Sequence, residues 1–558
     1  MLDPNRGIKM KTKVVTAGII CMLMLCGFVG MLNFKNAGVN AKTLYVGGSG
    51  GGNYTTIQAA IDNASAGDTV YVYSGLYNET LTINKTLNLI GESSKNTTVN
   101  GTGSGDVLYI NANNVVISGF TIKNCGKGDW DAGIDLHNSK DCSIINNNVS
   151  SNGNVGIFVR YSINITIDNN YLHSNIWHGI FLYSSRNNSI VNTTLIQTNI
   201  KLYASKYNSI ENNVIVGPSK TEHMSGINLH YACNENRIVN NNIINWTGNG
   251  IKVYYSHDNN ISKNKIDNNG HVSKFHHNEY CGIAMEYSHE NSISWNLITR
   301  TSYVGIAAYS SVNNLIFYNK IRDNPAGYSC AANEKQNIIY LNEFINNTNN
   351  TDYIASYNLW NSLKPLSYLY KGENFTKYLG NYWDDYSGND SDGDGIGDTP
   401  YNISGISTTY QDNFPLISPI DNYTLIPSTT KIKLVETSSN STNITVSLIM
   451  HTAKLDAAIT GFLNGIVNIT KLEIIIINSS YFAGFGFFRS NYRAVIEGKV
   501  YEGHWIGMLF NKSGERKFYL KGTVAGGLRG ITDGYLIESK NGSGVYNVYN
   551  SKKITERG

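Results

Sequence analysis

A short glycine phrase returns about every 23 residues through the middle of this chain and constrains its fold more than any other feature. Two copies read Gly-Ile-Phe-Leu-Tyr at 179–183 and Gly-Ile-Lys-Val-Tyr at 250–254. The glycines that open the copies are Gly133, Gly156, Gly179, Gly226, Gly250, Gly282, Gly305 and Gly327. One wide interval contains a further copy at 200–203, and another contains an insertion. Self-similarity at a fixed period is typical of a stacked array.

A period this short, with alternating apolar residues and no helical pattern, predicts coils built from short β-strands. One coil cannot bury an apolar face alone, so the coils stack about 4.8 Å apart and their strands pair in parallel. Alternate residues then point inward and outward. Asn, which is frequent at the expected coil corners, tolerates left-handed backbone and can form side-chain ladders between coils. This combination resembles the right-handed, pectin-lyase-like parallel β-helix family over residues 42–380.

The two ends of this region sharpen the resemblance. Residues 54–64 predict a short helix, with Ile57 and Ile61 four apart after capping threonines, which would cover the first coil. Residues 380–386 read Gly-Asn-Tyr-Trp-Asp-Asp-Tyr and lead into an Asp-rich stretch. Both ends resemble the carbohydrate-binding and sugar-hydrolase group that includes NosD, the periplasmic protein that assists copper delivery to nitrous oxide reductase. Such a resemblance indicates the fold, and a fold does not by itself carry a function.

The remaining segments set the domain boundaries. Four basic residues between 6 and 13 precede an uncharged stretch, so residues 1–41 predict a signal peptide or, if uncut, an N-terminal membrane anchor. We therefore expect a secreted or cell-surface protein, and its many Asn-x-Ser/Thr triplets suit a glycoprotein. Residues 381–427 form an Asp-rich end of the β-helix. From 428 to 558 the strands lose the coil period and predict a separate antiparallel β-domain.

Charge and cysteine content narrow the possible partners. The net charge of +3 is too small to indicate a nucleic-acid-binding protein. Five cysteines follow the N-terminal segment, an odd number that leaves at least one thiol free unless it pairs between chains. Their scatter gives no metal-ligand spacing, so we expect buried thiols between coils. These cysteines are Cys125, Cys142, Cys233, Cys281 and Cys330.

Alignment of the coils on their glycines places outward residues in two columns along one face. The columns combine aromatic rings with charged and hydrogen-bonding groups, as a polysaccharide groove requires. The alternative is that tyrosine is simply favoured on exposed strands. Trp130, Trp177 and Trp246 on neighbouring corners favour a glycan-binding or structural envelope protein whose partner is a polysaccharide or cell-surface glycan. The predicted binding residues are Trp130, Phe158, Arg160, Trp177, Phe181, Tyr183 and His230.

An enzymatic role is the alternative, with Asp135 and His137 as the catalytic pair. Their Asp-x-His spacing puts both side chains on one outward face, where they could share proton transfer. The pair is similar to the Asp-x-His of mannuronan C5-epimerases, which have this fold, and the resemblance implies a lyase, hydrolase or epimerase. Those enzymes have a Tyr where Ala132 stands and a second Asp where Arg160 or Tyr161 stands. A binding surface is the alternative for the same residues.

Residues 390–398 predict a structural Ca²⁺ site. Asp390, Asp392, Asp394 and Asp398 occupy the first, third, fifth and ninth places of a calcium loop, and Ile396 offers its carbonyl. A sensor loop has Glu at the twelfth place, where this chain has a tyrosine, so we expect a static site. The alternative is a solvated Asp/Gly turn.

Copper is the metal that the NosD resemblance implies, and a NosD-like copper accessory protein is a third functional alternative. The insertion holds the one candidate cluster in the sequence, and imidazole with thiolate suits copper. Nearby Lys274 would oppose a cation, so a solvated loop is the preferred interpretation and copper is not expected. The cluster would consist of His271, His276, His277, Glu279 and Cys281.

Overall fold

The structure is a computed structural model, and it describes most of the chain from residue 41 onward. The description omits residues 219–223, 271–279, 332–335, 356, 405–408, 427–429, 434–444, 452–453, 464–466, 476–484, 497–498, 512–516, 527, 539–543 and 557–558. The predicted signal segment, apart from Ala41, lies outside the described residues, as does the histidine loop at 271–279. No helix in the described parts of the chain has the length and apolar character needed to cross a bilayer.

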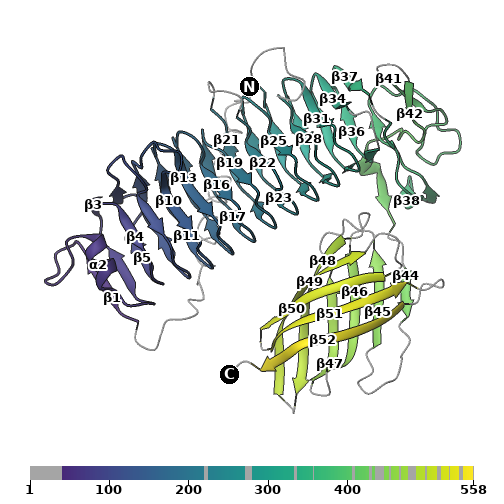
Figure 1. The fold of residues 1–558 in the computed structure, drawn as a ribbon. Coiled ribbons are helices and arrows are strands. Elements are labelled where there is room, and N and C mark those ends of the chain that lie inside the picture. Colours follow the sequence, from purple (N-terminus) through teal and green to yellow (C-terminus); the bar gives the residue numbers. More distant parts are fainter. Residues whose placement is uncertain are drawn as a thin grey trace, which may run out of the picture. The chain divides into compact units, whose positions relative to one another are not determined.

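The fold is an all-β, right-handed parallel β-helix, as the repeat predicted, followed by a small antiparallel sheet (Figure 1). The chain divides into two compact units, residues 1–171 and 172–558, and each is described by itself. In both units each complete coil contributes one short strand to each of three parallel sheets. We call them the first, second and third sheets.

In the first unit the strands pair in parallel with those one coil away. The first sheet holds β1 (Thr43–Val46), β2 (Thr69–Val72), β5 (Asn88–Gly91), β8 (Val116–Ser118), β11 (Ser143–Ile145) and β14 (Thr166–Asp168). The second holds β4 (Leu81–Ile83), β7 (Leu108–Ile110), β10 (Ala132–His137) and β13 (Val155–Arg160). The third holds β3 (Gly75–Asn78), β6 (Thr97–Asn100), β9 (Thr121–Lys123) and β12 (Asn148–Ser150), while β15 (Tyr171–His173) spans the boundary between units.

The second unit repeats the arrangement. Its first sheet holds β17 (Ser189–Val191), β20 (Ser209–Glu211), β23 (Arg237–Val239), β26 (Asn260–Ser262), β29 (Ser292–Ser294), β32 (Leu315–Phe317) and β35 (Ile338–Tyr340). Its second holds β16 (Ile180–Tyr183), β19 (Ile200–Tyr203), β22 (Ile227–His230), β25 (Ile251–Tyr254), β28 (Ile283–Glu286), β31 (Val304–Tyr309), β34 (Ala326–Ala331) and β37 (Asn349–Ile354). Its third holds β18 (Thr194–Ile196), β21 (Val214–Val216), β24 (Asn242–Ile244), β27 (Lys265–Asp267), β30 (Leu297–Thr299), β33 (Lys320–Arg322), β36 (Glu343–Ile345) and β40 (Tyr382–Trp383).

The recurring glycine has a steric cause. Gly250 precedes β25, and a Cβ added there would lie 2.4 Å from Cγ2 of Ile266 and 2.7 Å from the carbonyl oxygen of Gly282. Real Cβ atoms do not approach that closely, so the stacking of coils leaves room only for glycine. The isoleucine that follows the glycine and the residue that pairs with it in the next coil are both fully buried, as at Ile251 and Ile283. The glycine of the phrase therefore marks a close approach between the backbones of two coils, and the isoleucine after it belongs to the buried core.

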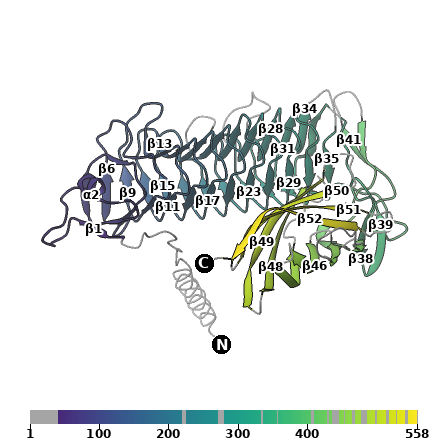
Figure 2. The same ribbon diagram turned by 60° about the horizontal axis from the view of Figure 1, so that its bottom comes forward.

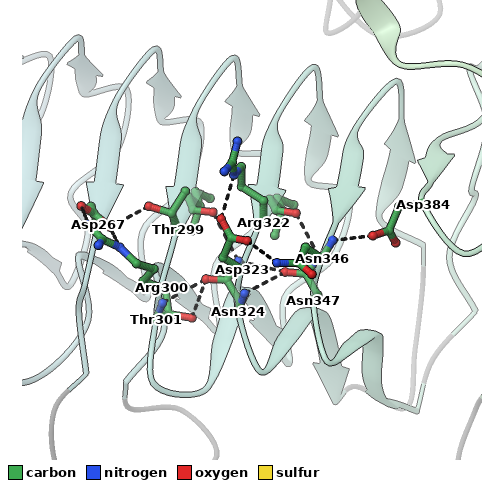
Figure 3. Close-up of polar contacts among 12 residues, drawn as sticks. Asp267, Thr299, Arg300, Thr301, Arg322, Asp323, Asn324, Asn346, Asn347 and Asp384 are labelled. Atoms are coloured by element: carbon green, nitrogen blue, oxygen red, sulfur yellow. Dashed lines mark hydrogen bonds and ion pairs between the residues drawn. The ribbon is translucent and has the colours of Figure 1, made fainter.

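Asparagines fill two different roles, and one of them is the predicted ladder. Corner asparagines such as Asn268 adopt left-handed backbone, with φ 56°. Buried asparagines instead link coils: Asn241 donates its main-chain N–H to Oδ1 of Asn264, 2.9 Å away, and Asn264 donates in the same way to Asn296 at 2.9 Å. Figure 3 shows this kind of linkage, where Asn324 accepts from the main chain of Thr301 at 3.0 Å. These ladders satisfy polar main chain that would otherwise be buried without partners.

Helix α2 (Ile57–Asn63) forms where the sequence predicted a short helix (Figure 2). The side-chain oxygen of Thr56 accepts from the N–H of Ala59, which is an N-cap. Ile57 and Ile61 are buried, so the apolar pair four residues apart faces the protein as expected.

Beyond the coils, antiparallel pairs replace parallel ones. β38 (Leu366–Tyr370) pairs with β39 (Glu373–Lys377) and β43 (Tyr423–Leu425), next to the short helix η2 (Ile420–Asn422), and β41 (Tyr401–Ser404) pairs with β42 (Thr409–Asp412). The final antiparallel sheet has nine strands in chain order: β44 (Thr430–Lys433), β45 (Thr445–His451), β46 (Lys454–Leu463), β47 (Val467–Ile475), β48 (Phe485–Ile496), β49 (Lys499–Asn511), β50 (Lys517–Gly526), β51 (Leu528–Glu538) and β52 (Gly544–Glu556).

Candidate functional site

In the first unit the structure brings together two carboxyl groups and a guanidinium. Asp135 on β10 is fully buried, and Arg160 on β13 binds both of its oxygens, with Nε 3.0 Å from Oδ1. Asp106, one coil earlier, accepts from the N–H of Ala132 at 2.8 Å. Burial and the neighbouring Asp135 raise the pKa of Asp106 to about 7, and burial raises the pKa of Asp135 although Arg160 opposes the rise. The sequence analysis missed Asp106 because it lies in a corner loop outside the strand columns.

The burial of Asp135 corrects the expectation that it stands on an open outward face. Its neighbour in register, Phe158, was also expected to be open and has no exposed surface, because Trp130 from a corner loop stacks on it at 5.7 Å between ring centroids. Trp130 itself is half exposed. His137 lies 6.0 Å from the ring of Tyr109. In this arrangement Asp135 holds Arg160 in place, and its own side chain does not reach the protein surface.

The second unit carries a stack of aromatic rings along the end of its second sheet. Tyr183 and Tyr203 stack at 5.3 Å with an angle of 6° between ring planes. His230 follows at 5.9 Å from Tyr203, and Tyr254 follows at 5.0 Å from His230. The strands hold this order because β16, β19, β22 and β25 pair in parallel, with Tyr203 opposite His230 and His230 opposite Tyr254. We call these four residues the aromatic ladder.

Three further tyrosines, one position after the strand ends, run beside the ladder. Tyr231 and Tyr255 stack at 5.3 Å, and Tyr255 and Tyr287 stack at 4.6 Å. Their side chains are 41%, 39% and 44% exposed, and their φ angles are 55°, 45° and 49°. The same position is left-handed in neighbouring coils, as at Ser184 and Ala204, so this backbone belongs to the corner of the coil. We call these three residues the outer tyrosines; the sequence analysis overlooked them because they follow, rather than occupy, the alternating strand positions.

The start of the ladder is lined by Trp177, His178 and Phe181. Trp177 is 42% exposed, as a rim residue should be, but Phe181 is 5% exposed and corrects the expectation of an open position. The Nζ atom of Lys201 lies 5.4 Å from the ring centroid of Trp177 and 5.5 Å from that of Phe181. Burial, and next the charge of Lys201, lower the pKa of His178 to about 3. Trp246, expected on a neighbouring corner, is fully buried and donates Nε1–H to the carbonyl of Ile215 at 3.3 Å.

The acidic loop forms a compact group at the far end of the coils. Asp390, Asp392 and Asp394 can each offer an oxygen within 4.8 Å of the others, and this trio is the sole group of three or more candidate ligands among the described residues. Oδ1 of Asp390 is buried without a hydrogen-bond partner. Lys377 lies 3.0 Å from Asp394 and 3.4 Å from Asp392.

The other two predicted ligands are not part of the trio. Asp398 accepts from the main chain and the hydroxyl of Ser391 at 3.0 and 2.6 Å. The N–H of Ile396 donates to Asp394 Oδ1 at 2.7 Å. The structure thus gathers three of the four predicted carboxylates.

The three parallel sheets and their stacked coils define a right-handed β-helix protein of the pectin-lyase-like class. Residues 84–215 and 132–273 match the family described as "right handed beta helix region". Residues 247–388 match the family described as "periplasmic copper-binding protein (NosD)". The resemblance to the right-handed β-helix group that includes NosD is therefore confirmed, with matches from residue 84 to residue 388.

Several solved structures are similar in fold. The A-module of mannuronan C-5 epimerase AlgE6 from Azotobacter vinelandii is 16% identical, with 54% of this chain and 92% of that chain covered and a TM-score of 0.37. The catalytic unit of a GH87 α-1,3-glucanase from Streptomyces thermodiastaticus is 12% identical, with 58% and 66% covered and a TM-score of 0.41. At these identities the likeness concerns the fold alone. A search of curated protein sequences gave no match.

Proposed function

We propose that this protein is an exported β-helix protein that binds a glycan along the aromatic ladder and outer tyrosines of its second unit. The observation that carries the proposal is the run of stacked rings on successive coils, from Tyr183 to Tyr254, with three half-exposed tyrosines beside it. Aromatic faces stack on sugar rings, and phenol hydroxyls bond to sugar hydroxyls. Export rests on the N-terminal segment alone.

The repeat of the rings suits a linear polymer. One ring stands on each coil, and coils recur about every 4.8 Å, so a polysaccharide lying along the sheet meets a new ring at each coil. The outer tyrosines stand on three consecutive coils and are 41%, 39% and 44% exposed, so their rings are open to a sugar.

A glycan array followed by calorimetry with the best polymer tests the proposal. Tyr255→Ala is expected to weaken binding by about 1–3 kcal/mol, by analogy with bases stacked on aromatic side chains. Tyr207→Ala is the matched control, because Tyr207 is 50% exposed with φ 59° and lies at a different corner. Equal affinity of the two variants, or an array without a hit, would overturn the proposal.

An enzymatic role is the second candidate, with His137 and the newly found Asp106 as the reacting groups in the first unit and the buried Asp135 as the partner that holds Arg160. Its supporting observation is the pair of adjacent carboxyls, one of which has a pKa of about 7, a value suited to proton transfer near neutral pH. Analysis of polysaccharide products tests it. New reducing ends, unsaturated products or epimerised sugars that vanish in Asp106→Asn would support catalysis, and an unchanged polymer would exclude it.

We further propose that the acidic loop holds a structural Ca²⁺. Hard oxygen ligands suit this ion, and the buried Oδ1 of Asp390, which makes no hydrogen bond, is free to bind it. Binding to the folded state alone stabilises it, so the melting temperature should fall on chelation and recover with Ca²⁺. Asp394→Asn should abolish this response, whereas Lys377→Met should strengthen it by removing the competing ammonium. A melt that chelator leaves unchanged, with no retained ion by metal analysis, would refute the site.

A further inference from the structure

Lys201 occupies a distinctive position on the aromatic face. It stands on β19, pairs in register with Phe181 on one side and with Asn228 on the other, and is only partly exposed. Its neighbours in contact are the rings of Trp177 and Phe181. Within the described residues, no carboxylate forms an ion pair with it.

Lys252 stands two coils further along the same column and differs from Lys201 in having a carboxylate partner. Lys252 has a counter-ion, because Oε1 of Glu286 lies 3.0 Å from its Nζ atom. Lys201 has two rings instead, and burial lowers its pKa. A partly buried ammonium ion without a counter-ion is costly, because it loses hydration and gains no opposite charge.

Other polar groups around Lys201 also lack partners. Oδ1 of Asn228, the next residue in the column, and Nε2 of His178 are buried without a hydrogen bond. The field of Lys201 reaches both histidines of this face, because it contributes to the lowered pKa of His178 and of His230. The column thus joins a positive charge, which no carboxylate of the described residues pairs, to groups that can accept hydroxyl protons and to rings that can stack on sugars.

We propose that Lys201 selects an acidic glycan, whose carboxylate or sulfate group supplies the missing counter-ion while its sugar rings lie on the aromatic ladder. The inference rests on the proposed glycan binding and adds the charge of the ligand. A carboxylate or sulfate bound to Lys201 forms a charge-assisted hydrogen bond in a partly desolvated place, where such bonds are strongest. A neutral glycan would leave the ammonium ion uncompensated.

The test compares three polymers by calorimetry: a polyuronate, the same polymer after reduction of its carboxyl groups, and a sulfated polysaccharide. The parent protein is expected to bind at least one anionic polymer roughly tenfold or more tightly than the reduced one, which is about 1.4 kcal/mol. The preference should shrink as salt is raised, because screening weakens partly exposed charge pairs. Whichever anionic polymer binds identifies the group as carboxylate or sulfate.

Lys201→Met keeps the length of the side chain and removes its charge. It should abolish the preference for the anionic polymer and leave binding of the reduced polymer unchanged. Lys265→Met is the matched control, since Lys265 is an exposed lysine on β27 of the third sheet and changes the net charge equally. Equal binding of reduced and anionic polymers by the parent, or a Lys201→Met variant that retains the preference, would overturn this inference and leave glycan binding standing. Failure of all three polymers and of the glycan array would overturn both.

Discussion

Replacement of Asn264 by alanine tests whether the buried asparagines hold the coils together. Asn264 is 1% exposed, and its Oδ1 atom accepts from the main-chain N–H and from Nδ2 of Asn241 at 2.9 and 3.0 Å. Its Nδ2 atom donates to the carbonyl of Ile238 at 2.9 Å and to Oδ1 of Asn296 at 3.0 Å. Alanine removes all four hydrogen bonds.

Two of the four partners keep another bond. Nδ2 of Asn241 still donates to the carbonyl of Ile210 at 2.8 Å, and Oδ1 of Asn296 still accepts from the main-chain N–H of residue 264 at 2.9 Å. The main-chain N–H of Asn241 and the carbonyl of Ile238 lose this partner inside the protein. At about 1–3 kcal/mol for each buried polar group left without its partner, the expected cost is about 2–6 kcal/mol.

Denaturant unfolding measures this cost, and hydrogen exchange locates it. Coils contact only their neighbours, so exchange should accelerate most at 236–241 and 291–296, on either side of the substitution. Asn268→Gly is the control in the same coil, because Asn268 bonds through its side chain only at the surface and glycine accepts its φ of 56°. If Asn264→Ala lowers the free energy of unfolding no more than Asn268→Gly does, the buried asparagine side chains do not stabilise the stack of coils.

Three further predictions concern the face, the thiols and acid. Phe181→Ala should destabilise by about 3–5 kcal/mol because Phe181 is nearly buried, whereas Trp177→Ala, at a half-exposed site, should chiefly weaken glycan binding; equal unfolding midpoints would contradict the assigned burial. The buried thiols, such as Cys281 with a pKa of about 12, should resist thiol reagents until the protein unfolds. Because unfolded thiols ionise near pH 9 and buried ones do not, stability should fall as pH rises from about 9 to 11; titration of a Cys281→Ala variant should show a smaller fall. His178, with a pKa lowered to about 3 by burial, stays neutral in the folded state, so stability should fall as pH drops from about 6.5 toward 3, and His178→Gln should flatten that slope. An unchanged slope would show that His178 has the same pKa in the folded and unfolded states.

The sequence predicted the coils well because the repeated residues are the ones that contact the neighbouring coil. At Gly250 there is no room for a Cβ, and the isoleucine that follows is fully buried. Each copy of the phrase therefore fixes where its strand begins and which side chains point into the core. The antiparallel end was predicted for the same reason, from the loss of that period.

The candidate site was harder to predict because side chains from loops cover parts of the strands. Alternation places Phe158 and Phe181 outward, but it does not say that Trp130 will lie over the first or that Trp177 and His178 will close around the second. The outer tyrosines follow the strands in left-handed backbone, outside any period-2 pattern. Lys201 stood in a predicted column, but which of the described carboxylates reach it depends on how the chain folds, and alternation alone does not give that.

The aromatic ladder also relates the length of this face to the number of coils that carry a ring. Each added coil would bring one more ring, one more buried asparagine and one more close-packed glycine, and it would leave the contacts within the older coils unchanged. A duplication of one coil inside 226–254 would therefore lengthen the face by a fixed step without redesign of the core. If the proposed glycan lies along the ladder, the number of coils that carry a ladder ring would set how many sugar residues it can hold at once.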